Sequence, residues 1–456
     1  MDKKIFWLLF VLVIAGFSLR IFLTDCYYWD ELVYLQHAEI LSSNKADNYN
    51  ELEFRPPMLP VMISGAYIFW HNPLIGNVLV VVMASVSVLL IYLAGKEIFD
   101  QKTGLIAAVL LAFWPLHIYF SKTLLVHTTA MFFALLFLFF LKKGENKGNE
   151  WFFCLAGVFI GSAILTRFTY LILIPVAGID FLLFRKRYDL KKIIFGAAGF
   201  LAVILPYLSW AYIRFNDPLH TFKTASLIVS WSTRQPWYFY LENLWIFLGF
   251  TGVIGVCSWI FFRFKDKKIN KEEILLWSWI LLPFIYLSFK LMHKEVRFLI
   301  VALAPVILIS AYGVKRILER IKNKTLVFIL LIVVILPLSL FFAYDPYVRT
   351  CDSNAQKASE WIMNNSNKED VIYAQHEFPA LAYYTNRKIV LAPFDKKRFF
   401  NKTMNHMKKQ GYYVYFEEQK NKDRFPKTEE IENDERFKLV KKIEDENEVY
   451  IYKIIS

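Results

Sequence analysis

The residues best suited to chemistry begin with two adjacent carboxylates, Asp30 and Glu31, in the stretch 27–34 that follows the first apolar segment. An ionised carboxylate can take the proton of a hydroxyl nucleophile and so act as a general base. The next residues, 32–41, have apolar positions at helical spacing, which predicts a short amphipathic helix lying in a membrane interface. Asp30 could instead only cap this helix, because Asp is a favoured N-cap residue and Glu31 suits the positive end of the helix dipole.

A second group of ionisable residues lies in the stretch 293–298, which contains His293, Lys294, Glu295 and Arg297. The stretch joins two apolar runs and is too short to be a solvated loop. Charges at a membrane boundary are costly, so function is the default hypothesis for them. The alternative is that Lys294 and Arg297 reach towards lipid headgroups while Glu295 pairs with one of them.

Two more arginines interrupt apolar sequence. Arg55 precedes Pro56 and Pro57, which restrict the backbone and would fix the position of this cation. Arg167 stands between two short apolar runs. Each could instead be an ordinary charge, at a helix start for Arg55 and in a turn facing headgroups for Arg167. Because guanidinium and ammonium groups stabilise a phosphate, these cations together with the carboxylates suit transfer from a lipid-linked phosphosugar.

The composition places these residues in a polytopic membrane protein. Of the 456 residues, 56% are hydrophobic and only 20% are charged, and long apolar runs are frequent. The first run is too long for a signal-peptide core and no small-residue cleavage site follows it, which predicts a retained helix. About eleven spans are expected near bilayer length, at 5–23, 74–95, 104–120, 124–141, 151–166, 170–184, 191–213, 242–264, 273–291, 298–314 and 325–344.

The basic connections predict the orientation of these spans. By strict alternation they fall on one side, which the positive-inside rule assigns to the cytoplasm together with the N-terminus; they lie at 142–147, 185–192, 263–271 and 315–324. The apolar stretch 58–70 is too short to cross a bilayer, so 24–73 is expected to be one outer loop. The candidate residues then gather on the outer face, with His127 at the outer end of the fourth span. The net charge of +13 reflects the cytoplasmic loops and does not indicate a nucleic-acid partner.

The composition changes abruptly after Tyr344. Residues 345–456 are predicted to form an extracytoplasmic α/β domain that follows a membrane domain at 1–344. Asn364 and Asn401 lie in Asn-x-Ser/Thr triplets and are possible glycosylation sites. The sequence pattern predicts two helices in this domain, at 353–364 and 378–384. It predicts four strands, at 370–375, 388–391, 412–416 and 448–454.

The four cysteines have no metal-ligand spacing. Cys154 and Cys257 fall within apolar runs and are expected to be packing residues. Cys26 and Cys351 both fall outside the membrane in this topology and could form a disulfide. With no evident ligand cluster, no required metal or cofactor is predicted.

The order of the motifs resembles that of the C-type superfamily of membrane glycosyltransferases that use polyprenyl-phosphate sugars. The closest likeness is to protein O-mannosyltransferases and to the aminoarabinose transferase of lipid A. The matching elements, in chain order, are Asp30-Glu31 with Tyr34 and Ala38, Arg55-Pro56-Pro57-Met58-Leu59, Thr166-Arg167, and Glu295-Val296-Arg297-Phe298-Leu299 with Pro305.

The resemblance implies a role for each candidate residue. Asp30 would deprotonate an acceptor hydroxyl in a reaction that inverts the anomeric centre, and Glu31 would orient the acceptor or stabilise the site. The residues implied at the donor phosphate are Arg55, Arg167 and Arg297 with Lys294, and the supporting residues are Tyr34, His127, His293 and Glu295.

Three departures from the aminoarabinose enzyme argue against lipid A modification. Phe54 stands where that enzyme has an acidic residue before the basic-Pro-Pro element, and Val33 stands where it has an arginine. His127 replaces a position that is often acidic in the family. The acceptor therefore stays open among a protein hydroxyl, a growing glycan and a lipid headgroup.

Three functions are alternatives to the transfer of a single sugar. A transporter or flippase of lipid-linked sugars would be expected to carry charges deep in its spans and helices broken near the midplane. An oligosaccharide-transferring enzyme would carry a Trp-Trp-Asp motif in its outer domain, and the sequence has none. A structural scaffold would leave the charged outer face unexplained.

Overall fold

The computed structural model describes residues 3–21, 27–43, 54–230, 235–321, 353–374, 376–392, 411–416, 426–444 and 448–455. The chain divides into two compact units. One comprises 1–23, 53–59 and 72–346, and the other comprises 24–52, 60–71 and 347–456. The second unit therefore combines the tail with most of the first long loop, which the sequence assigns to the membrane domain.

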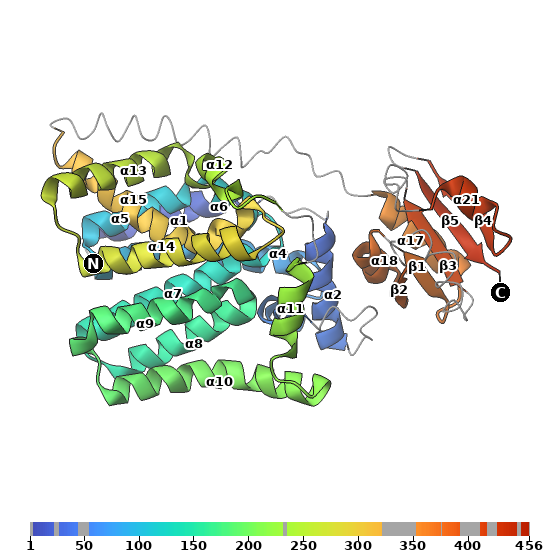
Figure 1. The fold of residues 1–456 in the computed structure, drawn as a ribbon, viewed down its shortest axis with the longest axis horizontal. Coiled ribbons are helices and arrows are strands. Elements are labelled where there is room, and N and C mark those ends of the chain that lie inside the picture. Colours follow the sequence, from blue (N-terminus) through green and yellow to red (C-terminus); the bar gives the residue numbers. More distant parts are fainter. Residues whose placement is uncertain are drawn as a thin grey trace. The chain divides into compact units, whose positions relative to one another are not determined.

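The first unit is a bundle of helices (Figure 1). Within it α8 packs against both α7 and α10, and α13 packs against α15. Its elements are α1 (Lys3–Ser18), α4 (Leu74–Ile98), α5 (Gln101–Ala112), α6 (Pro115–Ser121), α7 (Val126–Lys147), α8 (Glu150–Thr166), η2 (Phe168–Ile172), α9 (Leu173–Leu183), η3 (Arg185–Arg187), α10 (Leu190–Phe215), α11 (His220–Ser230), α12 (Phe239–Glu242), α13 (Leu244–Asp266), α14 (Lys271–Lys290), η4 (Val296–Ala302) and α15 (Leu303–Leu318).

The multi-pass helical fold is confirmed. Among the described residues, six helices are long and apolar enough to cross a membrane, and seven if the bent pair α5–α6 is one span. Two shorter apolar segments, α8 and η2–α9, lie at two more of the predicted spans. The predicted span 325–344 lies outside the described residues. Met58–Trp70 does not form a span, since α3 (Met58–Ala66) has nine residues.

The bend between α5 and α6 amounts to 56°. Pro115 begins α6 and has no backbone N–H to donate, so Leu111 O accepts from the Trp114 N–H at 3.3 Å in place of a regular helical donor, and the helix breaks at the last carbonyl groups of α5. The buried guanidinium of Arg20 donates to two of them, Leu111 O and Ala112 O, each at 3.1 Å. A side chain from the turn that follows α1 thus supplies hydrogen bonds to these backbone carbonyls, which lipid could not do.

Small residues allow α8 and α10 to approach closely. A methyl group at Gly157 would collide with the Gly196 carbonyl, and one at Gly199 would collide with the Cys154 carbonyl. Close approach through small residues is the usual way in which helices pack in a membrane.

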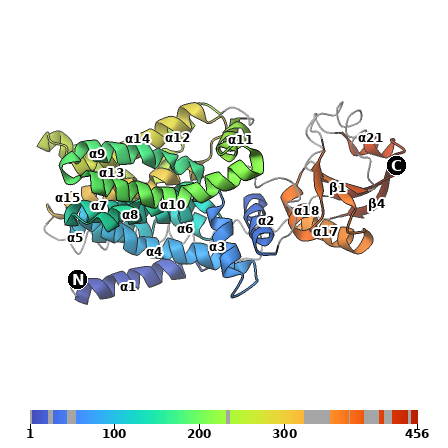
Figure 2. The same ribbon diagram turned by 90° about the horizontal axis from the view of Figure 1, so that it is seen from below.

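The second unit contains a five-stranded sheet in the order β2-β1-β3-β5-β4, with β1 parallel to β2 and β3 and the other pairs antiparallel. Helices α17 and α18 pack on one face, with Ile372, Val414 and Ile451, and α21 packs on the other through Ile431 (Figure 2). The elements are α2 (Trp29–Ser43), most of α3, α17 (Ser353–Asn365), β1 (Val371–Ala374), α18 (Phe378–Thr385), β2 (Ile389–Leu391), β3 (Gly411–Phe416), α21 (Thr428–Glu432), β4 (Phe437–Ile443) and β5 (Val449–Ile454).

The predicted α/β composition of the tail is confirmed, but two elements were missed. β4 carries three lysines in seven residues and lies at the sheet edge, where lysine disfavours pairing with a further strand. These lysines also interrupt the alternation of apolar residues by which a strand is recognised in a sequence. α21 has only five residues, too few for a helical period to be visible.

Helix α2 occurs where a helix was expected, but it is longer and is not amphipathic. Residues Glu31 to Glu39 are all buried, so no polar face is presented along this stretch. The prediction of an amphipathic helix was wrong because the sequence pattern could not reveal which elements cover the helix.

Candidate functional site

The first turn of α2 holds the two predicted catalytic carboxylates. The helix begins at Trp29, so Asp30 is its second residue and does not occupy the N-cap position. The buried carboxylate of Glu31 accepts a hydrogen bond from the Tyr28 backbone N–H at 2.8 Å, as the third residue of a capping box does. Capping is therefore attributed to Glu31, and the alternative that Asp30 serves as the N-cap is wrong. Tyr34 is buried one turn further along α2.

In the first unit, Arg167 reaches across to α7. Its backbone is extended and ends α8, which turns the side chain away from that helix. The guanidinium contacts the buried imidazole of His127 at the start of α7, and its Nε donates to Thr169 Oγ1 at 3.1 Å. The same guanidinium lies over the ring of Phe298, with 4.8 Å from Cζ to the ring centroid.

Arg297 approaches the same aromatic ring. Its Cζ lies 5.8 Å from the Phe298 centroid, and it donates to Glu295 Oε1 at 2.8 Å. The imidazole of His293 also bonds Glu295 Oε1, at 2.9 Å. Burial opposes ionisation of Glu295, but the bonds and charge of Arg297, and then of His293, hold its pKa below the ordinary value.

Lys294 lies in the same connection, but its ammonium is turned to the backbone. It donates to the carbonyls of Gln235 at 2.9 Å and Leu291 at 2.7 Å. These bonds tie the segment before α12 to the end of α14. Its role at a phosphate stays a prediction.

The structure thus brings together five of the predicted residues near the ring of Phe298, namely Arg167, Arg297, His127, His293 and Glu295. The group contains two guanidiniums and one carboxylate, so its formal charge is positive. Guanidinium forks match phosphate oxygens, so such a group can bind a phosphate. Sequence reasoning named the arginines, but it did not single out Phe298 as the ring on which they meet.

Arg55 lies in the same unit, in the turn before α3, with its guanidinium stacked on Phe54 at 5.2 Å. Its role at the donor also stays a prediction.

An apolar groove of about 620 Å³ is lined in part by Ile164 and Leu171, which flank Arg167 in the chain. Phe168, the residue that follows Arg167, packs its ring 4.3 Å from the ring of Phe222, which lines the groove. The other lining residues come from α8, η2, α10, the turn before α11 and α11 itself, and are Ile164, Leu171, Phe200, Ile204, Leu208, Leu219, Lys223, Ser226 and Leu227. Such a groove can hold a hydrocarbon chain next to a cationic group.

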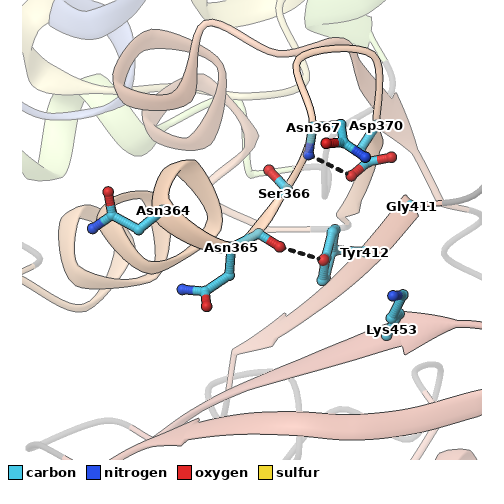
Figure 3. A pocket seen from close by; sticks show the side chains of 8 residues that line it. All are labelled: Asn364, Asn365, Ser366, Asn367, Asp370, Gly411, Tyr412 and Lys453. Atoms are coloured by element: carbon cyan, nitrogen blue, oxygen red, sulfur yellow. Dashed lines mark hydrogen bonds between the residues drawn. The ribbon is translucent and has the colours of Figure 1, made fainter.

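A polar hollow of about 320 Å³ lies in the second unit (Figure 3). It is formed by the end of α17 and the starts of β1 and β3. Its polar groups partly satisfy each other, since Tyr412 Oη donates to the Asn365 carbonyl at 2.8 Å and Asp370 accepts from the Asn367 N–H at 2.8 Å. Asn364 of the first glycosylation triplet is exposed at its rim. Ligands of open α/β sheets bind at the carboxyl ends of strands, and this hollow lies at the amino ends.

The sequence did not reveal a buried ionic network at the predicted cytoplasmic ends of the helices. The ammonium of Lys142, only 2% exposed, contacts Asp180 and bonds Glu145 Oε1 at 3.0 Å. Arg187 and Tyr188 complete the network through the same carboxylates. The prediction that 142–147 is a basic connection was wrong, because α7 continues to Lys147.

A second buried cation was also missed. Besides capping α5, Arg20 bonds His117 Nδ1 at 2.9 Å. The only sequence signal was an arginine near the end of an otherwise apolar run. Within the described ranges, no group of three or more His, Cys, Asp or Glu side chains could hold a metal ion.

The cysteine predictions have mixed outcomes. Cys154 is half-buried in α8, whereas Cys257 is exposed on α13, so it is not packed as expected. Cys26, Cys351 and Asn401 lie outside the described residues, and the disulfide stays a prediction.

Comparisons with known proteins agree with the motifs. Residues 54–210 match the family model of dolichyl-phosphate-mannose-protein mannosyltransferases. An undecaprenyl phosphate-α-4-amino-4-deoxy-L-arabinose arabinosyl transferase from Aeromonas hydrophila is 22% identical over 198 residues, which are 40% of this chain and 35% of that protein. An uncharacterized protein from Aquifex aeolicus is 25% identical over 306 residues, 64% of this chain and 60% of the relative. The matches thus span about a third and three-fifths of these two relatives.

Solved structures share the fold over nearly the whole chain. ArnT from Cupriavidus metallidurans bound to undecaprenyl phosphate matches with a TM-score of 0.69 and 13% identity, covering 99% of this chain and 98% of that one. The oligosaccharyltransferase of Archaeoglobus fulgidus matches with a TM-score of 0.68 and 13% identity, covering 92% and 70%. The family match, the relatives and the shared fold confirm the resemblance of this chain to the C-type superfamily of membrane glycosyltransferases.

Proposed function

We propose that the protein is an inverting glycosyltransferase that moves a single sugar from a polyprenyl-phosphate donor to an acceptor hydroxyl outside the cytoplasm. The observation that carries the proposal is the pair Arg167 and Arg297 on the ring of Phe298, beside an apolar groove. A polyprenyl-phosphate sugar combines an anion with a long hydrocarbon chain, and these two features complement the cations and the groove.

In the proposed reaction, Asp30 acts on the attacking acceptor, and Arg167 and Arg297 act on the departing phosphate. Asp30 takes the proton of the acceptor hydroxyl, and the acceptor oxygen attacks the anomeric carbon. The bond from that carbon to the phosphate oxygen breaks, and the polyprenyl phosphate leaves with one more negative charge. Arg167 and Arg297 stabilise this added charge, so their binding energy is greatest as the leaving group departs. Glu31 keeps the first turn of α2 closed behind Asp30.

The predicted orientation of the spans in the membrane supports these proposed roles. Groups predicted to share a side of the membrane contact each other, as Lys315 and Asp100 do at 2.6 Å at the predicted cytoplasmic ends. Arg167, His127 and Arg297 likewise meet at the predicted outer ends. We therefore assign the N-terminus to the cytoplasm and the C-terminal domain to the outside, where a protein, a glycan or a lipid headgroup supplies the hydroxyl.

Transfer of an oligosaccharide is the second candidate, because the fold also matches an archaeal oligosaccharyltransferase. The two candidates differ in the donor that supports turnover. A donor carrying one sugar is sufficient for the first, whereas the second requires a longer glycan.

The test is transfer in membranes supplied with labelled polyprenyl-phosphate sugars, comparing the wild type with Asp30→Asn. The change keeps size and hydrogen bonding but removes the base, and it is expected to reduce transfer by several orders of magnitude while donor binding persists. Asp266→Asn, a carboxylate at the opposite ends of the spans, is the matched control and should leave transfer within a few-fold. Undiminished transfer by Asp30→Asn would reject the proposed base. Movement of the lipid across the bilayer without any transfer would favour a flippase instead.

A further inference from the structure

We propose that the C-terminal sheet domain positions the candidate base, with Phe378 as the positioning residue for Asp30. The inference rests on the proposed function and extends it to a domain more than 300 residues away in sequence. It assigns to this domain a part in turnover that does not depend on binding the acceptor.

The first observation is the packing of α2 on α18 (Figure 2). The ring of Trp29 meets the ring of Phe378 edge to face, with centroids 4.5 Å apart, and lies 6.0 Å from the ring of His376. Leu32 is 2% exposed and belongs to the core cluster that also contains Phe378 and Leu381. Helix α2 therefore contributes to the hydrophobic core of the sheet domain.

These contacts lie directly beside the candidate base. Trp29 and Leu32 are three residues apart, on one side of the helix, and Asp30 lies between them in the first turn. The backbone of Asp30 is consequently flanked by the partly buried Trp29 and the buried Leu32, which both pack against the cluster that contains α18. Removing Phe378 removes the nearer of the two aromatic partners of Trp29, the residue immediately before the base.

A second contact holds the far end of α2 in the same unit. Glu39 pairs with His71 at 2.9 Å, and the His71 ring stacks on Tyr67 at 4.4 Å. Burial, followed by the charge of Glu39, raises the pKa of Tyr383 on α18. Glu39 thus lies within electrostatic reach of the same helix that holds Trp29, and α2 is fixed near both ends.

Such fixing matters because the distance from base to hydroxyl decides the rate. A displacement of about 1 Å can reduce turnover by about 10²-fold. A domain that only shields the site, or only binds the acceptor, would not need to share its core with the helix that carries the base.

The test is transfer by the full-length protein carrying Phe378→Ala, with kcat and the KM values for donor and acceptor measured separately. Phe437→Ala is the matched control, since Phe437 is buried on the opposite face of the same sheet against Tyr413 and Tyr452. Both changes remove one ring from the domain core, but only the first removes a contact with α2. Phe378→Leu and Phe437→Leu, which keep most of the volume, form a milder pair in case the alanine variants fail to fold.

Phe378→Ala is expected to lower kcat by about 10- to 100-fold with both KM values nearly unchanged, and Phe437→Ala to lower it less than about 3-fold. In the Asp30→Asn background, Phe378→Ala should cause no further loss, because the group that it positions is already absent. Equal losses for the two ring deletions, a loss confined to the acceptor KM, or full additivity with Asp30→Asn would each overturn the inference. A failure of Asp30→Asn to reduce transfer would instead reject the proposed function itself.

Discussion

The guanidinium of Arg167 contacts the imidazole of His127, joining the end of α8 to the start of α7. A ring nitrogen that accepts from a guanidinium carries no proton, so the imidazole is neutral and adds no charge to the group. His127 therefore orients Arg167 rather than binding an anion by its own charge.

His127→Phe is expected to raise the donor KM by about 10-fold, because it keeps the ring but removes the hydrogen-bond acceptor of a charged donor. Steady-state transfer with a labelled polyprenyl-phosphate sugar measures the change. An unchanged KM for His127→Phe would mean that Arg167 is oriented by other contacts.

Arg297→Gln is expected to weaken binding of polyprenyl phosphate by about 30-fold or more, because truncating a partly buried charge partner costs at least about 2 kcal/mol. Equilibrium binding of the lipid phosphate in detergent measures this loss without turnover. Arg316→Gln removes an equivalent guanidinium that pairs with Asp266 and should leave binding intact. Equal losses in the two variants would indicate a general effect of positive charge.

Glu295 should make the stability of the membrane unit depend on pH in the acidic range. Its folded pKa is lowered below the ordinary value of 4.5, so its contribution is complete above that pH and is lost as pH falls through the folded pKa. Thermal unfolding in detergent from neutral pH down to pH about 3 should show a fall that Glu295→Gln flattens. A parallel fall in both proteins would assign the acid sensitivity to other groups.

Lys142→Met is expected to destabilise the fold by about 3–5 kcal/mol, since it leaves the carboxylates of Asp180 and Glu145 buried without their ammonium. Lys143→Met is the neighbouring control. That ammonium lies over the rings of Phe139 and Phe152, and its loss should cost about 1 kcal/mol. Denaturant or thermal unfolding of the purified proteins gives the comparison, and similar values for the two variants would contradict a stabilising network.

Ser226→Trp should discriminate between donors by chain length. Ser226 is exposed and lines the apolar groove, so an indole there fills space without disturbing the core. We expect kcat/KM to fall about 10-fold for a long polyprenyl donor and little for a short-chain analogue, as lost apolar burial of about 50 Å² would produce. Ser209→Trp, on an exposed position of α10 outside the groove, is the control. Equal effects on both donors would place the chain elsewhere.

The sequence by itself determined the class of the fold and the order of its spans. Backbone groups in lipid must be satisfied within a helix, so a hydrocarbon-length apolar run predicts a helix directly. The same local logic found α2, α17 and α18 and placed Asp30, Arg167 and Arg297 near helix ends. These properties depend on neighbours in the chain and can be inferred without a partner segment.

Only the tertiary structure decided which of these residues meet. Arg167 and Arg297 are 130 positions apart, and their shared contact with Phe298 depends on how α8 ends and how η4 begins. The burial of Lys142 depends on its contact with Asp180 of α9. The burial of α2 on all sides cannot be inferred from the sequence of that helix. Periodicity reports which side of a helix is apolar, whereas packing between distant segments decides what each side touches.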